Sequence, residues 1–238
     1  MIKDTFEINV GGKPIMIKTT NWTEQASGSC LISQGETEVL VTATLSPFTR
    51  EGMDYFPLTV EYEERFYATG KILGSRFMKR EGRATDEAVL NARMIDRAIR
   101  PLFPKDFKKE VQVIVTCLSF DGINDPDING EFIFNPTYEQ KKESNMDLTL
   151  SAIYKPARNA SHSDAGGDGE VLVNMIEMGS KEISEDDVLK ATKLAEPEIK
   201  NIIEAQAKAV KKIGKTKDEF LPAVELGIEN EIKEFLGD

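Results

Sequence analysis

The chain has 238 residues, of which 40% are hydrophobic and 30% charged, and its formal net charge at pH 7 is −11. This length allows a sizeable core and predicts either one large domain or a domain with an appendage. No stretch approaches the roughly 18 uninterrupted apolar residues of a membrane helix, and the first residues lack the apolar core of a signal peptide. We therefore expect a cytoplasmic protein with no membrane partner. The negative net charge also argues against a protein that binds nucleic acid nonspecifically over its whole surface.

Residue types that often carry covalent or metal chemistry are few. Cys30 and Cys117 lie in apolar, strand-like runs and are expected to be core thiols, because two distant cysteines do not make a disulfide framework or a zinc site. His162, the single histidine, stands in a glycine-rich stretch with no partner for a triad or a metal site. The carboxylates of residues 121–127 are more typical of turns than of a divalent-ion site. These residues predict no catalytic group and no metal site.

Alternating apolar and polar residues predict that much of the chain before residue 183 is sheet. Gly11 and Gly12 are expected to turn the first hairpin, and Gly35 lies in the turn of the second. The strand over residues 37–45 is almost continuously apolar or β-branched, so it is expected at the centre of its sheet. The predicted strands are residues 6–10, 14–17, 28–33, 37–45, 58–62, 111–118, 131–134, 146–153 and 170–176.

From Ser184 onward the pattern becomes helical. Ser184 and Asp187 have the spacing of a capping box, apolar residues then recur with an approximately helical period, and Gly214 is expected to end the helix. Pro197 is expected to kink or divide it. A second amphipathic helix is expected over residues 218–235. This change predicts a mixed α+β domain over residues 1–183 and a helical appendage over residues 184–238.

Residues 65–109 are basic within an acidic chain, with 12 Lys or Arg against 5 Asp or Glu. Residues 67–83 lack a periodic apolar pattern and are expected to form a long loop. A helix is expected from the cap Thr85, with three arginines within about 60° of one another and apolar residues on the opposite arc. The arginines are Arg93, Arg97 and Arg100, and the apolar residues are Leu90, Met94, Ile95, Ala98 and Ile99.

Such segregated positive charge predicts a surface for a polyanion, because crowded cations repel one another unless they are compensated. Two other interpretations stay open. In the first, the stretch is only a solvated basic surface. In the second, its arginines pair with Asp96 and other local acids.

Four stretches are specific enough to indicate a family. They read DYFPLTVEYEER at residues 54–65, KREGR at 79–83, IDRAIRPLFP at 95–104 and NPT at 135–137. Together they resemble bacterial polynucleotide phosphorylase, in particular its first RNase PH-like domain. The resemblance is collinear and runs from Phe6 to about Gly214.

The resemblance implies an α+β RNase PH fold of ribosomal-protein-like βαβα architecture, followed by the family's helical linker domain. It implies a homotrimeric ring that admits single-stranded RNA and degrades it from the 3′ end, with other RNA-degradation proteins as further partners. Inorganic phosphate is the implied co-substrate, and Mg²⁺ or Mn²⁺ is the implied cofactor of the full-length enzyme.

The resemblance also assigns the basic stretch to RNA binding. Residues 77–80 correspond to the family's aromatic and basic constriction loop, although Met78 and Lys79 replace the more usual aromatic and arginine residues. Rings and cations of this kind stack on bases and hold phosphates without reading sequence. The implied RNA-binding residues are Phe77, Met78, Lys79, Arg80, Arg83, Arg93, Arg97 and Arg100.

Two departures from the family bear on catalysis. The family has about 30 more residues between Ile128 and Asn129, including the loop that holds phosphate in active domains. Where active domains carry two metal-binding carboxylates, this chain has only Asp147. The family's phosphorolytic centre belongs to a second RNase PH domain, so this portion is expected to guide RNA and build the ring without catalysing the reaction or holding the metal. A stand-alone phosphorolytic nuclease and a non-catalytic scaffold subunit are the alternatives.

Overall fold

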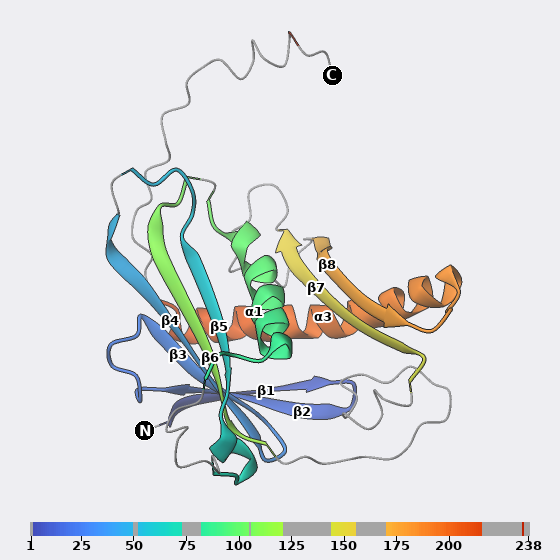
Figure 1. Cartoon of the computed structure of the whole chain (residues 1–238), viewed down its shortest axis with the longest axis horizontal. Coiled ribbons are helices and arrows are strands. Elements are labelled where there is room, and N and C mark those ends of the chain that lie inside the picture. Colours follow the sequence, from blue (N-terminus) through green and yellow to red (C-terminus); the bar gives the residue numbers. More distant parts are fainter. Residues whose placement is uncertain are drawn as a thin grey trace.

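The computed structural model describes residues 2–49, 52–72, 82–104, 106–120, 144–155, 170–215 and 235. Six strands form one sheet in the order β1-β2-β3-β4-β6-β5, and two more form the separate sheet β7-β8 (Figure 1). The elements in chain order are β1 (Ile2–Val10), β2 (Lys13–Thr20), β3 (Gly28–Gln34), β4 (Thr37–Thr49), β5 (Leu58–Glu64), η1 (Phe66–Thr69), α1 (Asp86–Ile99), η2 (Arg100–Leu102), β6 (Lys109–Ser119), β7 (Met146–Lys155), β8 (Glu170–Ser180) and α3 (Glu185–Ile213).

The two predicted N-terminal hairpins are confirmed. β1 pairs antiparallel with β2, and β3 with β4. Gly11 and Gly12 connect β1 to β2 at φ 58° and 79°, a backbone conformation that residues with a Cβ rarely adopt. β4 lies between β3 and β6 inside the sheet, as its apolar sequence predicts.

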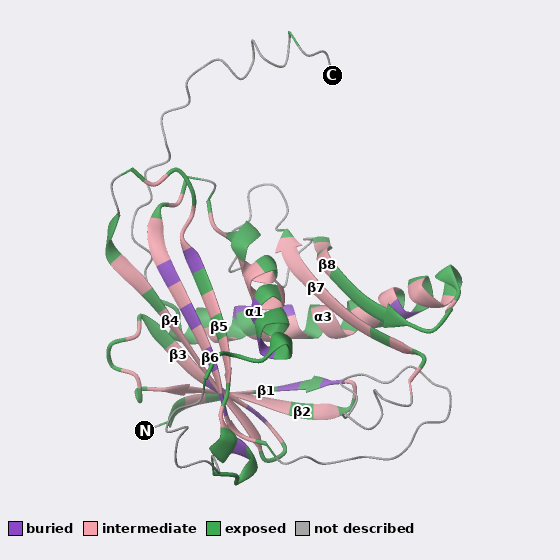
Figure 2. Cartoon of the chain, in the orientation of Figure 1, coloured by how far each residue is buried: buried purple, intermediate pink, exposed green. Residues whose placement is uncertain are grey.

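The core lies where β5 and β6 meet α1. β6 alternates between buried and half-buried residues, and Val111, Val113 and Val115 form one buried cluster with Leu58 of β5. Figure 2 shows buried segments on β5, β6 and α1 in this region. Cys117 is also buried on β6, whereas Cys30 on β3 is half-buried, and neither forms a disulfide. The expectation of a core thiol is therefore confirmed for Cys117, whereas Cys30 is only partly covered.

α1 begins as predicted, because the side chain of Thr85 accepts a hydrogen bond from the backbone N–H of Ala88. Its core face differs from the predicted arc. Ala88 and Ala92 are buried, and Ile95 and Ile99 pack on the main core, but Leu90 is 54% exposed. The prediction for Leu90 was wrong because α1 presents the turn containing the alanines to β5.

α3 forms one continuous helix through Pro197, so the expected division does not occur. Ser184 caps its first turn by accepting from the backbone N–H of Asp187, and Gly214 ends it, as predicted. The helix contacts β1 and β7, and the Lys212 ammonium lies 2.6 Å from the Asp4 carboxylate of β1. These contacts, which the sequence does not indicate, join α3 to both sheets (Figure 1).

Several predicted segments lie outside the described residues. They are the strand at 131–134, the helix at 218–235 apart from residue 235, and the glycine-rich stretch around His162. The division at residue 183 therefore remains a prediction. Within the part of the chain that the structure describes, no helix is long and apolar enough to cross a membrane.

Candidate nucleic-acid interface

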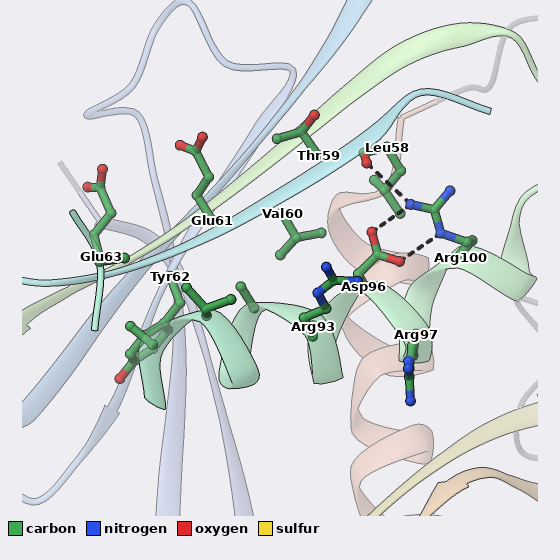
Figure 3. Close-up of a pocket in the computed structure, with 14 residues that line it drawn as sticks. Leu58, Thr59, Val60, Glu61, Tyr62, Glu63, Arg93, Asp96, Arg97 and Arg100 are labelled. Carbon is green, nitrogen blue, oxygen red and sulfur yellow. Dashed lines mark hydrogen bonds and ion pairs between the residues drawn. The ribbon is translucent and has the colours of Figure 1, made fainter. Parts of the chain in front are cut away.

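A groove of about 860 Å³ runs between β5 and α1 (Figure 3). Its strand wall consists of six consecutive residues, from Leu58 to Glu63. Its helix wall has a floor of small side chains and a rim that carries the three predicted arginines. The helix-side residues are Ala84, Ala88, Val89, Ala92, Arg93, Asp96, Arg97 and Arg100.

Arg100 is engaged by its own chain. Its Nε and Nη2 atoms donate to the two carboxylate oxygens of Asp96 at 2.7 and 2.6 Å. It also donates to the backbone carbonyls of Phe56 and Leu58, at 3.2 and 3.3 Å, and its guanidinium lies over the Phe56 ring. The hydrogen bond to Asp96 raises the pKa of Arg100 above its ordinary value. Pairing with Asp96, one of the open interpretations, therefore describes this arginine.

Arg93 and Arg97 differ from Arg100. Both are exposed on the groove, and within the described ranges neither forms an ion pair or a hydrogen bond through its side chain. Figure 3 shows Arg97 directed away from the pair of Asp96 and Arg100. Two uncompensated guanidinium groups one helical turn apart can bind an anion with repeated charges.

The last turn of α1 is held from the second sheet by Asn174 of β8. Its Nδ2 donates to the carbonyls of Arg97 and Ala98 at 3.4 and 3.3 Å, and its Oδ1 accepts from the Ser151 hydroxyl at 2.9 Å. Carbonyls at a helix C-terminus lack intrahelical partners, so this amide satisfies them. Sequence reasoning missed Asn174, although a single polar residue in the run 171–176 is a signal for a specific hydrogen bond.

Tyr62 adds an aromatic ring to the groove. It is half-buried on β5 and faces α1, whereas Glu61 and Glu63 face away from the helix (Figure 3). Burial, followed by the nearby Cys117 and Glu64, raises the pKa of the Tyr62 phenol above its ordinary value. The phenol is therefore neutral at pH 7, and the groove combines one neutral aromatic ring with two open cations.

The other predicted RNA-binding residues divide into two groups. Arg83 is described and exposed, immediately before α1. Phe77, Met78, Lys79 and Arg80 lie outside the described residues, so the constriction loop remains a prediction.

Asp147 is exposed on β7, opposite Gly179 of β8. Among the residues whose placement is described, no group of three or more His, Cys, Asp or Glu is arranged to hold a metal ion.

Comparison with known structures defines the class of protein by its fold. The crystal structure of rice (Oryza sativa) Rrp46 superposes with a TM-score of 0.55 at 13% identity and covers 83% of this chain and 94% of that chain. Residues 11–165 match domain 1 of the 3′ exoribonuclease family, RNase PH. The chain therefore belongs to the RNase PH family of 3′ exoribonucleases, and the predicted RNase PH-like fold is confirmed.

Curated relatives narrow the similarity within that family. The polyribonucleotide nucleotidyltransferase of Finegoldia magna is 40% identical over 265 residues, which cover 99% of this chain and 35% of the relative. That of Staphylococcus aureus is 39% identical over 250 residues, covering 93% of this chain and 33% of the relative. The chain thus spans about a third of these relatives.

The alignment with the Finegoldia magna protein is longer than the 238 residues of this chain. That relative therefore has residues within the matched region that this chain lacks. The sequence predicts such a difference in length, because the family has about 30 more residues between Ile128 and Asn129 than this chain.

Proposed function

We propose that this chain is the RNA-guiding portion of a phosphorolytic 3′-to-5′ exoribonuclease that acts on single-stranded RNA. Membership of the RNase PH family and 40% identity to a polyribonucleotide nucleotidyltransferase support the reaction class. The observation that carries the guiding role is the pair of exposed, uncompensated arginines, Arg93 and Arg97, on an open groove. A homotrimeric ring is part of the proposal.

The proposed reaction needs no protein nucleophile. An oxygen of inorganic phosphate attacks the last phosphodiester phosphorus, the P–O3′ bond breaks, and nucleoside diphosphate leaves. The shortened RNA takes up a proton as its new 3′-hydroxyl. The enzyme binds two anions in line and offsets their charge with Mg²⁺ or Mn²⁺.

We assign that chemistry to another part of the full-length enzyme. A metal site for phosphoryl chemistry usually combines carboxylates, and Asp147 alone is a poor Mg²⁺ ligand set. The portion described above contributes positive charge and an open groove, which suit binding and guiding an RNA strand. Catalysis by this chain alone is the competing function.

An activity measurement separates these two functions. The purified chain is mixed with single-stranded RNA, phosphate and Mg²⁺, and released nucleoside diphosphate is measured. We expect no release above that of a reaction without protein. Phosphate-dependent release would contradict the non-catalytic assignment and support a stand-alone nuclease.

A binding measurement tests the guiding role against a scaffold role. Replacing both Arg93 and Arg97 by Ala is expected to weaken single-stranded RNA binding at least about tenfold at low salt and to flatten the dependence of log K on log salt, because fewer counterions are released. Replacing Lys200 and Lys208, two exposed lysines of α3, by Ala is the matched control for loss of two cations. Unchanged RNA affinity in the double variant would favour the scaffold.

A further inference from the structure

The groove touches β5 along the edge of the strand. Side chains of consecutive strand residues point to opposite faces of a sheet. All six residues from Leu58 to Glu63 nevertheless line this one groove. The one surface that all six residues can share is the backbone edge of the strand. This edge is not covered by another strand, because β5 is the terminal strand of its sheet. The backbone of β5 therefore forms one wall of the groove.

The pairing of β5 with β6 determines which backbone groups face the groove. The N–H of Val111 on β6 donates to the carbonyl of Pro57 at 3.0 Å, and the two strands are parallel. Because both backbone groups of a strand residue point to the same edge, Thr59 and Glu61 also face β6. The groups of Leu58, Val60 and Tyr62 face the groove.

Arg100 and the turn into η1 limit the open part of this edge. Arg100 donates to the Leu58 carbonyl, and the Leu58 N–H donates to the Phe56 carbonyl. In the described part of the chain, no hydrogen bond engages the groove-facing backbone groups of Val60 and Tyr62. The carbonyl of Val60 and the N–H of Tyr62 therefore form one adjacent acceptor and donor pair.

An adjacent acceptor and donor complement the Watson–Crick edge of a nucleobase, since each of the four RNA bases presents a neighbouring donor and acceptor there. We propose that the groove between β5 and α1 binds one unpaired nucleobase of an RNA strand. The Val60 carbonyl and the Tyr62 N–H hydrogen-bond its edge, and the Tyr62 ring packs beside it. This inference rests on the proposed RNA-guiding function and adds a base site to the phosphate contacts.

The positions of the arginines fit a strand that passes over this site. Arg93 and Arg97 are four residues apart, which is about 6 Å along a helix axis. That rise is comparable with the spacing of neighbouring phosphates in an extended single strand. Both arginines line the same groove as Tyr62, and the Arg97 side chain is directed away from β5 (Figure 3). Phosphates on the helix side and a base on the strand side therefore occupy one site.

The same edge is a poor template for an added peptide strand. Strand addition uses a row of alternating donors and acceptors over several residues. Here Arg100 closes one end, and the chain turns into η1 after Glu64 at the other. Where this edge borders the groove, the open backbone groups are those of Val60 and Tyr62, which suffice for one base. The two neighbouring cations favour a phosphate-bearing ligand.

The test compares two probes of equal length and charge. One is a ten-nucleotide oligoadenylate, and the other is the same oligonucleotide with abasic riboses. We expect the full chain to bind oligoadenylate at least about fivefold more tightly, because each stacked base contributes to affinity. Tyr62→Leu should remove most of that preference, whereas Tyr62→Phe should keep it. Phe48→Leu, an exposed aromatic outside the groove, is the matched control and should also keep it.

Amide hydrogen exchange gives a readout that does not depend on any substitution. Exchange at the N–H of Tyr62 should slow when oligoadenylate is bound and remain unchanged with the abasic probe. Equal affinity for the two probes, a preference that survives Tyr62→Leu in a folded variant, or no protection of the Tyr62 N–H would each overturn the base site.

Failure of the base site and failure of the guiding function give different results. If replacing Arg93 and Arg97 weakens binding of both probes while the wild type shows no preference for bases, only the base site fails. If that double variant binds both probes as tightly as the wild type, the guiding function fails as well. Protection of the Tyr62 N–H by an alternating Thr-Val peptide, with none by oligoadenylate, would identify strand addition instead.

Discussion

Arg100 and Asp96, one helical turn apart at the end of α1, form a two-point ion pair at 2.6 and 2.7 Å. The same guanidinium donates to the carbonyl of Leu58, the first residue of β5, and to that of Phe56, which precedes the strand. Arg100 thus ties the C-terminal turn of α1 to the strand that forms the opposite wall of the groove. This arginine stabilises the groove, and Arg93 and Arg97 remain open to a ligand.

Replacing Arg100 by Ala should lower the free energy of unfolding by about 1–2 kcal/mol, because the carbonyls of Phe56 and Leu58 lose their donor. Asp96→Asn should cost only about 0.5 kcal/mol, since the pair is partly exposed to solvent. Arg100→Lys should not restore stability, because an ammonium lacks the planar fork. Urea denaturation measures all three. Equal stability of Arg100→Ala and the wild type would contradict the linking role.

Asn174 should hold the end of α1 through its amide donor. Asn174→Ala should lower stability by about 1 kcal/mol, and Asn174→Asp should lower it further at pH 7, because a carboxylate would face the carbonyls of Arg97 and Ala98. Thermal denaturation measures both, with Asn91→Ala on the exposed side of α1 as the control. If Asn174→Asp were as stable as the wild type, these hydrogen bonds would not contribute.

Gly214 should be required where α3 ends. A Cβ at this position would lie 2.4 Å from the carbonyl oxygen of Val210. Gly214→Ala should therefore lower stability by about 1 kcal/mol or more, through displacement of the helix end. Gly28→Ala is the matched control, because no atom lies within 4 Å of the Cβ it would add. Both are compared by urea denaturation, and similar losses at the two positions would contradict the steric explanation.

Stability should fall in alkaline solution. Burial raises the pKa of Cys30, Cys117 and Tyr62 above their ordinary values of 9.0, 9.0 and 10.0. The folded state therefore keeps these protons more tightly than the unfolded state. Their contribution is fully present below about pH 9 and is lost as pH rises through the folded pKa values.

Urea denaturation between pH 7.5 and 10.5 measures this dependence. The free energy of unfolding should decline above about pH 9, and Cys117→Ala should make the decline shallower. A free energy that is constant or rises over this range would contradict the assignment. The buffer series should be run with a reducing agent, so that thiol oxidation does not contribute.

Local sequence determined much of this protein. Alternating residues and turn glycines predicted the first hairpin, and a glycine turn between two apolar runs predicted the second. The almost continuous apolar and β-branched run of β4 predicted its central position, because a strand inside a sheet can be covered on both faces. Thr85, Ser184 and Gly214 fixed helix ends, since caps and terminators act through neighbouring backbone groups. The family was also visible, because its motifs are long and collinear.

Tertiary structure decided what neighbouring residues could not. Identical guanidinium groups on one helix face have different roles, because Asp96 and the β5 carbonyls lie within reach of Arg100 and no described carboxylate pairs with Arg93 or Arg97. Leu90 is exposed because the alanine face of α1 meets the sheet. The open edge at Val60 and Tyr62 depends on strand order, which pairs residues far apart in sequence. Composition and spacing therefore located the basic helix. The groove exists only because α1 packs against β5 in the folded protein.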